Sequence, residues 1–174
     1  MTFARTSAAA ALFALGASVA FAQTAPATVV DVAAGSPDHT TLVQAVTAAG
    51  LAETLQGAGP FTVFAPTNAA FAALPAGALD DLLKPENKDQ LVAVLGCHVV
   101  EAKAMAADVA KMIADANGSA EITTLGNCRL TATESGGTVM IGGAGGTPVT
   151  VTAADLEAGN GVVHVIDGVL LPAS

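Results

Sequence analysis

The stretch FTVFAPTNAAF at residues 61–71 decides the fold, because it joins a strand to an abrupt helix start. Residues 61–65 are rich in aromatic and β-branched side chains, which is typical of a strand. Pro66 has no backbone N–H to donate, so it ends strand pairing. Thr67 or Asn68 then offers a side-chain oxygen to the free N–H groups of the following helix. The stretch predicts a strand that turns sharply into a helix, with Thr67 and Asn68 in structural roles.

A second block, GVVHVIDGVLLP at residues 161–172, predicts a strand over residues 162–166. Alternate residues of this strand would face opposite sides of a sheet, and both sides are apolar apart from His164. Such a strand belongs in a sheet that is covered on both sides. We expect His164 to be hydrogen-bonded within or beside the core. Asp167 is expected to form the turn that follows, where its side chain can accept hydrogen bonds from nearby backbone amides.

Turn residues and hydrophobic periodicity divide the chain into short helices followed by short strands. The expected helices cover residues 29–33, 42–49, 51–55, 69–74, 78–83, 86–95 and 107–116. The expected strands cover residues 61–65, 97–100, 121–125, 128–134, 138–141, 149–152, 162–166 and 169–171. Because the helices gather in the first half and the strands in the second, we expect an α+β fold with a mostly antiparallel sheet.

The segment Cys97-His98-Val99-Val100 lies between the two blocks. In this order and spacing, the three segments resemble the two signature blocks and the central Tyr-His block of the fasciclin domain family. The resemblance implies a fasciclin-like domain over residues 29–172. It also implies a β-sandwich or wedge of about seven strands, with several helices packed along one side. For function it implies a non-enzymatic module that takes part in extracellular adhesion or matrix interaction.

The two cysteines of the chain, Cys97 and Cys128, are expected to form a disulfide. An even pair in an exported protein is most simply one bridge, although a free thiol at Cys97 beside His98 is the alternative. In animal members of the resembled family, the central block is associated with receptor binding. The resemblance therefore suggests a partner-binding role for His98, with Cys97 in place of the usual tyrosine. The bridge would tie a strand at Cys97 to a neighbouring strand.

Residues 1–22 have the features of a secretory signal peptide. Arg5 precedes an uncharged apolar run over residues 8–20, and Ala20-Phe21-Ala22 forms a small-x-small cleavage site. The run is shorter than the roughly 20 residues that a membrane-spanning helix needs. Residues 23–28 would form a short leader before the domain. We therefore expect a secreted or periplasmic protein without a membrane span.

Charge and composition exclude several function classes. The chain of 174 residues carries a formal net charge of −9, which disfavours binding to nucleic acid or to an anionic lipid surface. It contains no Trp and no Tyr, the residues on which deep sugar-binding clefts usually depend. No spacing of potential ligands suggests a metal site, and no cofactor is expected. His39 is expected to be exposed near a helix start.

The leading hypothesis is a secreted, non-enzymatic cell-adhesion or matrix-interaction module. Its expected partner is a cell-surface or matrix protein or a polysaccharide, and the chain is expected to be a monomer. One alternative is a periplasmic or secreted carrier of a small apolar ligand, since a core this apolar could hold a cleft. A second alternative is a thiol-dependent enzyme that uses Cys97 and His98.

Overall fold

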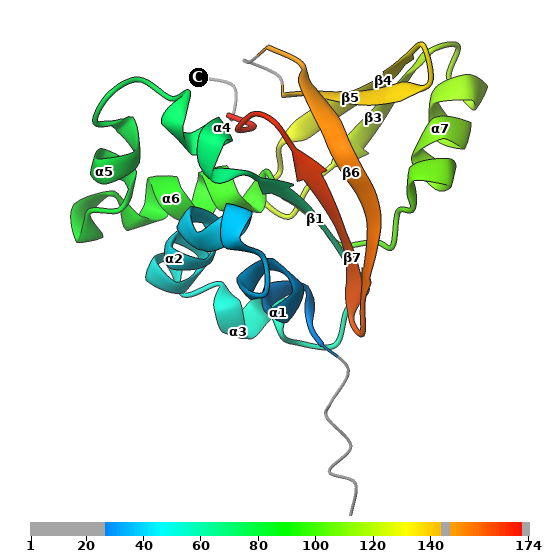
Figure 1. Cartoon of the computed structure of the whole chain (residues 1–174). Coiled ribbons are helices and arrows are strands. Elements are labelled where there is room, and N and C mark those ends of the chain that lie inside the picture. Colours follow the sequence, from blue (N-terminus) through cyan, green and yellow to red (C-terminus); the bar gives the residue numbers. More distant parts are fainter. Residues whose placement is uncertain (1–26, 144–146, 172–174) are drawn as a thin grey trace, which may run out of the picture.

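The structure is a computed structural model that describes residues 27–143 and 147–171. In this part of the chain, seven strands form one sheet in the order β2-β1-β7-β6-β5-β4-β3 (Figure 1). The strands are β1 (Phe61–Pro66), β2 (Val99–Val100), β3 (Ser119–Thr123), β4 (Arg129–Ser135), β5 (Thr138–Gly143), β6 (Val149–Ala158) and β7 (Gly161–Ile166). The helices are α1 (Val29–Ala34), η1 (Pro37–His39), α2 (Thr40–Ala49), α3 (Ala52–Leu55), α4 (Asn68–Ala72), α5 (Ala78–Leu82), η2 (Pro85–Asn87), α6 (Lys88–Gly96) and α7 (Ala106–Asp115).

The sheet is mostly antiparallel, with one parallel pair next to the short edge strand β2. Strands β1 and β7 run parallel over six residue pairs, from Phe61 with Gly161 to Pro66 with Ile166. All other neighbouring strands are antiparallel. The bulged strand β6 joins two parts of the sheet, since it pairs extensively with β7 but only at its first two residues with β5. The expected α+β wedge is confirmed.

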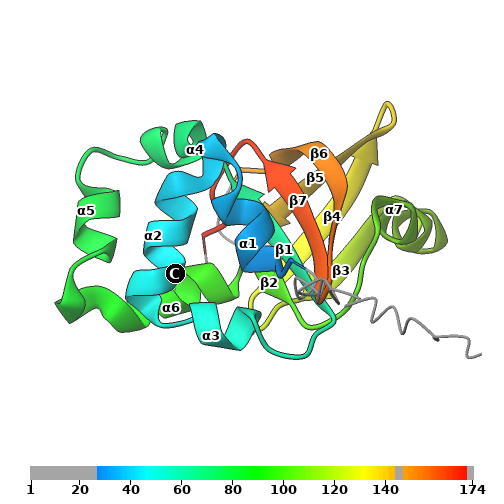
Figure 2. The same cartoon turned by 60° about the horizontal axis from the view of Figure 1, so that its bottom comes forward.

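Two apolar cores fill the spaces on either side of the central strands. Helices α1 to α6 lie on one side of the sheet, and α7 lies at the opposite end (Figure 2). Val63 of β1 and Val163 of β7 belong to the core beneath α1 to α6. Phe64 and Ile166, their neighbours on the other face, belong to the core beneath α7. Burial on both faces explains why these two strands are apolar almost throughout.

Of the expected strands, the one over residues 97–100 is only half right and the one over residues 169–171 is wrong. The segment 97–100 forms a strand only at Val99–Val100, because the turns of α6 continue through its first two residues. The Cys97 N–H donates to the Ala93 carbonyl at 3.0 Å, and the His98 N–H donates to the Leu95 carbonyl at 2.9 Å. Residues 169–171 form no strand, since the Leu170 N–H donates instead to the His98 ring at 2.9 Å.

Candidate functional site

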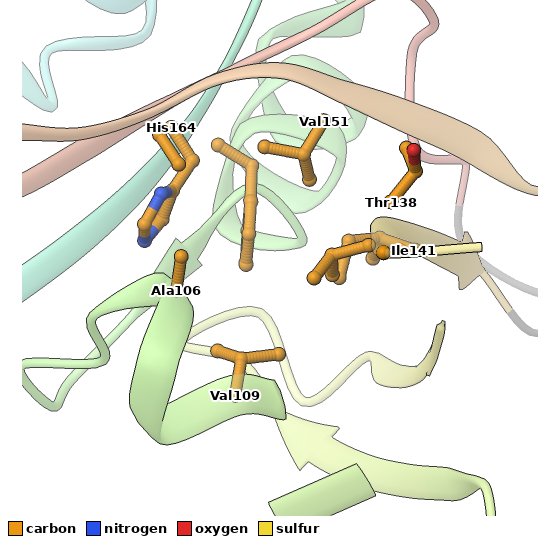
Figure 3. A pocket seen from close by; sticks show the side chains of 10 residues that line it. Ala106, Val109, Thr138, Ile141, Val151 and His164 are labelled. Atoms are coloured by element: carbon orange, nitrogen blue, oxygen red, sulfur yellow. The ribbon is translucent and has the colours of Figure 1, made fainter. Parts of the chain in front are cut away.

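An open apolar groove lies where α7 faces the separating strands β5 and β6 (Figure 3). Its volume is about 190 Å³. Ala106 and Val109 enter it from α7, Ile141 from β5, Val151 from β6 and His164 from β7. Phe64, Gly137, Thr138, Val139 and Ala154 complete the lining. The groove therefore draws its walls from segments that are far apart in the sequence.

His164 forms one polar part of this otherwise largely apolar lining, but both its ring nitrogens are already bonded. The ring is 2% exposed and stacks on Phe64, with ring centroids 5.7 Å apart. Nε2 lies 2.7 Å from the Ala104 carbonyl oxygen, to which it donates. Nδ1 accepts a hydrogen bond from the Asp155 N–H at 3.3 Å. The ring therefore connects β7, the bulge of β6 and the segment before α7.

The same segment is held by two further side chains, which fix the position of α7. The Thr62 hydroxyl donates to the Ala102 carbonyl and accepts from the Ala104 N–H at 2.9 Å. The Asp155 carboxylate accepts from the Ala106 N–H, the first of α7, at 2.8 Å. Asp155 has a φ of 59°, a left-handed conformation that Asp tolerates better than most residues. Together these bonds hold α7 so that its apolar side lines the groove.

The first signature block is organised by Thr67 and Asn68, which have different tasks. Thr67 is the cap of α4, since its side-chain oxygen accepts from the Ala70 N–H at 3.2 Å. Asn68 instead ties α4 to the preceding helices. Its amide nitrogen donates to the Pro37 carbonyl at 3.0 Å, and its oxygen accepts from the Thr41 N–H at 3.0 Å.

Asp167 lies directly after β7 and joins it to β6. Its carboxylate accepts from the Thr150 N–H at 2.8 Å, and its own N–H donates to the Thr150 carbonyl at 3.1 Å. The amide that it binds therefore belongs to the neighbouring strand rather than to its own turn. The arrangement is structural, because it fixes the start of β6 against the end of β7.

Cys97 and Cys128 are joined in a disulfide across 31 positions of sequence. The expected link between two strands is wrong, because Cys97 is the C-terminal cap of α6 and Cys128 lies just before β4. Two backbone hydrogen bonds run beside the bridge. The Gly126 N–H donates to the Gly96 carbonyl at 2.9 Å, and the Leu125 N–H donates to the Val99 carbonyl at 2.7 Å. The bridge thus fastens a helix end to the β3–β4 loop.

His98 lies inside the molecule and is 1% exposed. Its Nδ1 donates to the Val94 carbonyl at 2.7 Å, and its Nε2 accepts from the Leu170 N–H at 2.9 Å. Burial lowers the pKa of His98 to about 4, against the smaller raising effect of the bond to Val94. Contact between this ring and a partner would require the surrounding structure to open, so a partner-binding role for His98 stays a prediction.

The buried His98 makes the protein less stable in acid. The unfolded chain takes up a proton near the ordinary histidine pKa of 6.5, whereas folded His98 stays neutral to about pH 4. Stability is therefore lost as the pH falls from 6.5 to 4, at up to about 1.4 kcal/mol per pH unit. Urea unfolding at several pH values should show this slope, and His98→Gln should reduce it. An unchanged slope in the variant would contradict the assignment.

His39 is buried, so the expectation of an exposed side chain is wrong. The tight turn of η1 carries the ring inward, where it is 4% exposed. Neither ring nitrogen has a hydrogen-bond partner within the described part of the chain. Burial lowers the pKa of His39, more than the nearby negative charge of Asp38 raises it. His39 should therefore add to the loss of stability in acid.

The described residues show two further absences. Across residues 27–143 and 147–171, no three His, Cys, Asp or Glu side chains gather as metal ligands would. No helix in those two ranges is long and apolar enough to cross a membrane. The expected signal peptide over residues 1–22 lies outside the described residues.

Comparison with known proteins places the chain in a family. The Fasciclin domain family model matches residues 37–172. The chain is 51% identical over 145 residues to Protein sll1483 of Synechocystis sp., covering 83% of this chain and 73% of that protein. It is 35% identical over 145 residues to transforming growth factor-beta-induced protein ig-h3 of Sus scrofa, covering 83% of this chain and 19% of that protein.

A solved structure shows the same fold. The FAS1 domain pair of the insect cell adhesion molecule Fasciclin I matches with a TM-score of 0.60 at 22% identity. The match covers 73% of this chain and 43% of that one. The chain belongs to the fasciclin domain family, and the resemblance inferred from the sequence is confirmed.

Proposed function

We propose that the protein is a secreted or periplasmic, non-enzymatic module for cell adhesion or matrix interaction. Membership of the fasciclin family carries this proposal, together with the fold shared with a protein described as a cell adhesion molecule. Export is supported by the signal-like residues 1–22 and by the disulfide, a crosslink typical of oxidising compartments. The expected partner is a cell-surface or matrix protein or a polysaccharide, bound by a monomer.

The thiol-enzyme alternative is less well supported. Both sulfur atoms share the bridge, so neither cysteine offers a thiolate nucleophile in this state. His98 uses both ring nitrogens on backbone groups and cannot act as a base without losing one of them.

The apolar groove gives the carrier alternative little support. Its volume of about 190 Å³ is below the range of about 300–1,000 Å³ that is usual for small-molecule pockets. The two ring nitrogens of His164 are also committed, so they cannot orient a ligand. The groove therefore suits a side chain better than a whole carried molecule.

The adhesion proposal predicts saturable binding of the purified, oxidised protein to at least one of three surfaces. These are intact cells of the producing organism, its extracellular polysaccharide, and common matrix proteins. A heat-denatured sample serves as the control for adsorption. Absence of binding to all three, together with a small molecule found by native mass spectrometry, would instead favour the carrier.

A further inference from the structure

The strands β5 and β6 separate soon after they meet. They pair only at Met140 with Thr150 and at Ile141 with Val149. Beyond Thr150, β6 continues along β7 to Ala158, and no other strand in the described ranges pairs with this side of it. The groove lies at this separation, between β5 and α7. The wedge is therefore open between two adjacent strands.

The hairpin geometry shows which backbone groups of β5 face the opening. The β4–β5 turn has Gly136 and Gly137 at its centre, with φ values of 61° and 83°. This is the type I′ turn, whose flanking residues Ser135 and Thr138 form a hydrogen-bonded pair. Hydrogen bonding to the partner alternates along an antiparallel strand, so the N–H and C=O of Val139 point away from β4. Val139 thus presents, beside the groove, strand-pairing groups that no strand within the described residues uses.

The groove offers an apolar space next to this backbone edge. Val109, Ile141 and Val151 converge on it from three elements (Figure 3). Apart from the bonded His164, the polar side chain in its lining is Thr138, which is exposed at the rim. A partner would therefore gain affinity from backbone pairing along β5 and from one apolar side chain in the groove. A polysaccharide has neither a peptide backbone for such pairing nor an apolar amino-acid side chain.

We propose that the groove binds an extended polypeptide segment of a partner protein. The segment pairs with β5 at Val139 and inserts an apolar side chain between α7 and strands β5 and β6. Because the chain has a net charge of −9, segments with Lys or Arg flanking the apolar residue are favoured. This inference rests on the proposed adhesion function and names a protein, rather than a polysaccharide, as the partner.

A phage-displayed library of random heptapeptides is the probe, selected on the purified, oxidised protein. We expect enriched peptides with an apolar residue flanked by basic ones. The variant Ala106→Leu fills the groove from α7, and it should weaken binding of these peptides about tenfold or more. Ala107→Leu, at the exposed neighbouring position of the same helix, is the matched control and should bind as the wild type does. Equal binding by all three proteins would overturn the proposal.

Strand pairing has a second signature that does not depend on any protein variant. In an enriched peptide, N-methylation of the one residue that pairs with Val139 should abolish binding, while N-methylation of either adjacent residue should have little effect. No enrichment, or equal sensitivity at all positions, would overturn the proposal. If Ala106→Leu still binds cells or polysaccharide as the wild type does, the groove is not the site that binds the adhesion partner, and this proposal is overturned while the adhesion function stands.

Discussion

Replacing Gly161 by alanine should lower the free energy of unfolding by about 3 kcal/mol or more. Gly161 opens β7 and pairs with Phe61 at the start of the parallel ladder. A Cβ atom at this position would overlap the Phe61 carbonyl oxygen and lie 2.8 Å from its carbonyl carbon. Because both atoms belong to the backbone, no side-chain rotation can relieve the overlap. Strands β1 and β7 would have to move apart.

Gly142→Ala is the matched control for this prediction. Gly142 lies inside β5, where an added Cβ would meet its nearest neighbour, the Thr131 carbonyl oxygen, at 3.7 Å. The control should change stability by less than about 1 kcal/mol. Chemical denaturation of both variants measures the difference. A Gly161→Ala protein as stable as the control would show that β1 and β7 do not approach as described.

Removal of the Cys97–Cys128 bridge should lower the free energy of unfolding by about 3–4 kcal/mol. The bridge closes a loop of 31 positions, and in the chain-entropy model such a closure restricts the unfolded chain by that amount. The bridge also holds the end of α6 against the β3–β4 loop, so its loss frees this contact in the folded state.

Denaturant unfolding of the oxidised protein, with and without reductant, measures the contribution. A Cys97→Ala and Cys128→Ala double variant should have the stability of the reduced wild type and should not respond to reductant. A loss of less than about 1 kcal/mol would mean that the loop is already restricted in the unfolded chain.

The sequence predicted the elements whose signals are local. Pro66 and Thr67 mark the junction of β1 and α4 because a missing N–H and a capping oxygen act within a few residues. The apolar character of residues 162–166 predicted a strand buried on both faces, because this signal too is contained within a few neighbouring residues. The resemblance to the family blocks added the arrangement of these strands and helices in a wedge, which periodicity alone does not predict.

The errors arose where distant contacts decide the structure. Cys97 and His98 follow a helix and precede two valines, so local propensity favours a strand as well as it favours a further turn of the helix. The hydrogen bond from the Leu170 N–H to His98, 72 positions apart, determines that residues 169–171 do not pair as a strand. His39 appeared exposed because its burial depends on packing around η1 rather than on its own segment.

The groove could not be predicted, because its walls come from four strands, one turn and one helix that the chain brings together only on folding. Asp155 gave one local signal, since Asp adopts the left-handed conformation found here more readily than most residues. Its role in holding the start of α7 depends on a contact 49 positions away and leaves no trace in the local pattern.

Attachment of the producing organism to a surface tests the central claim most directly. A strain that lacks this protein should attach less than its parent in a flow or washing assay, and addition of the purified, oxidised protein should restore attachment. Unchanged attachment of the deletion strain would contradict an adhesion function.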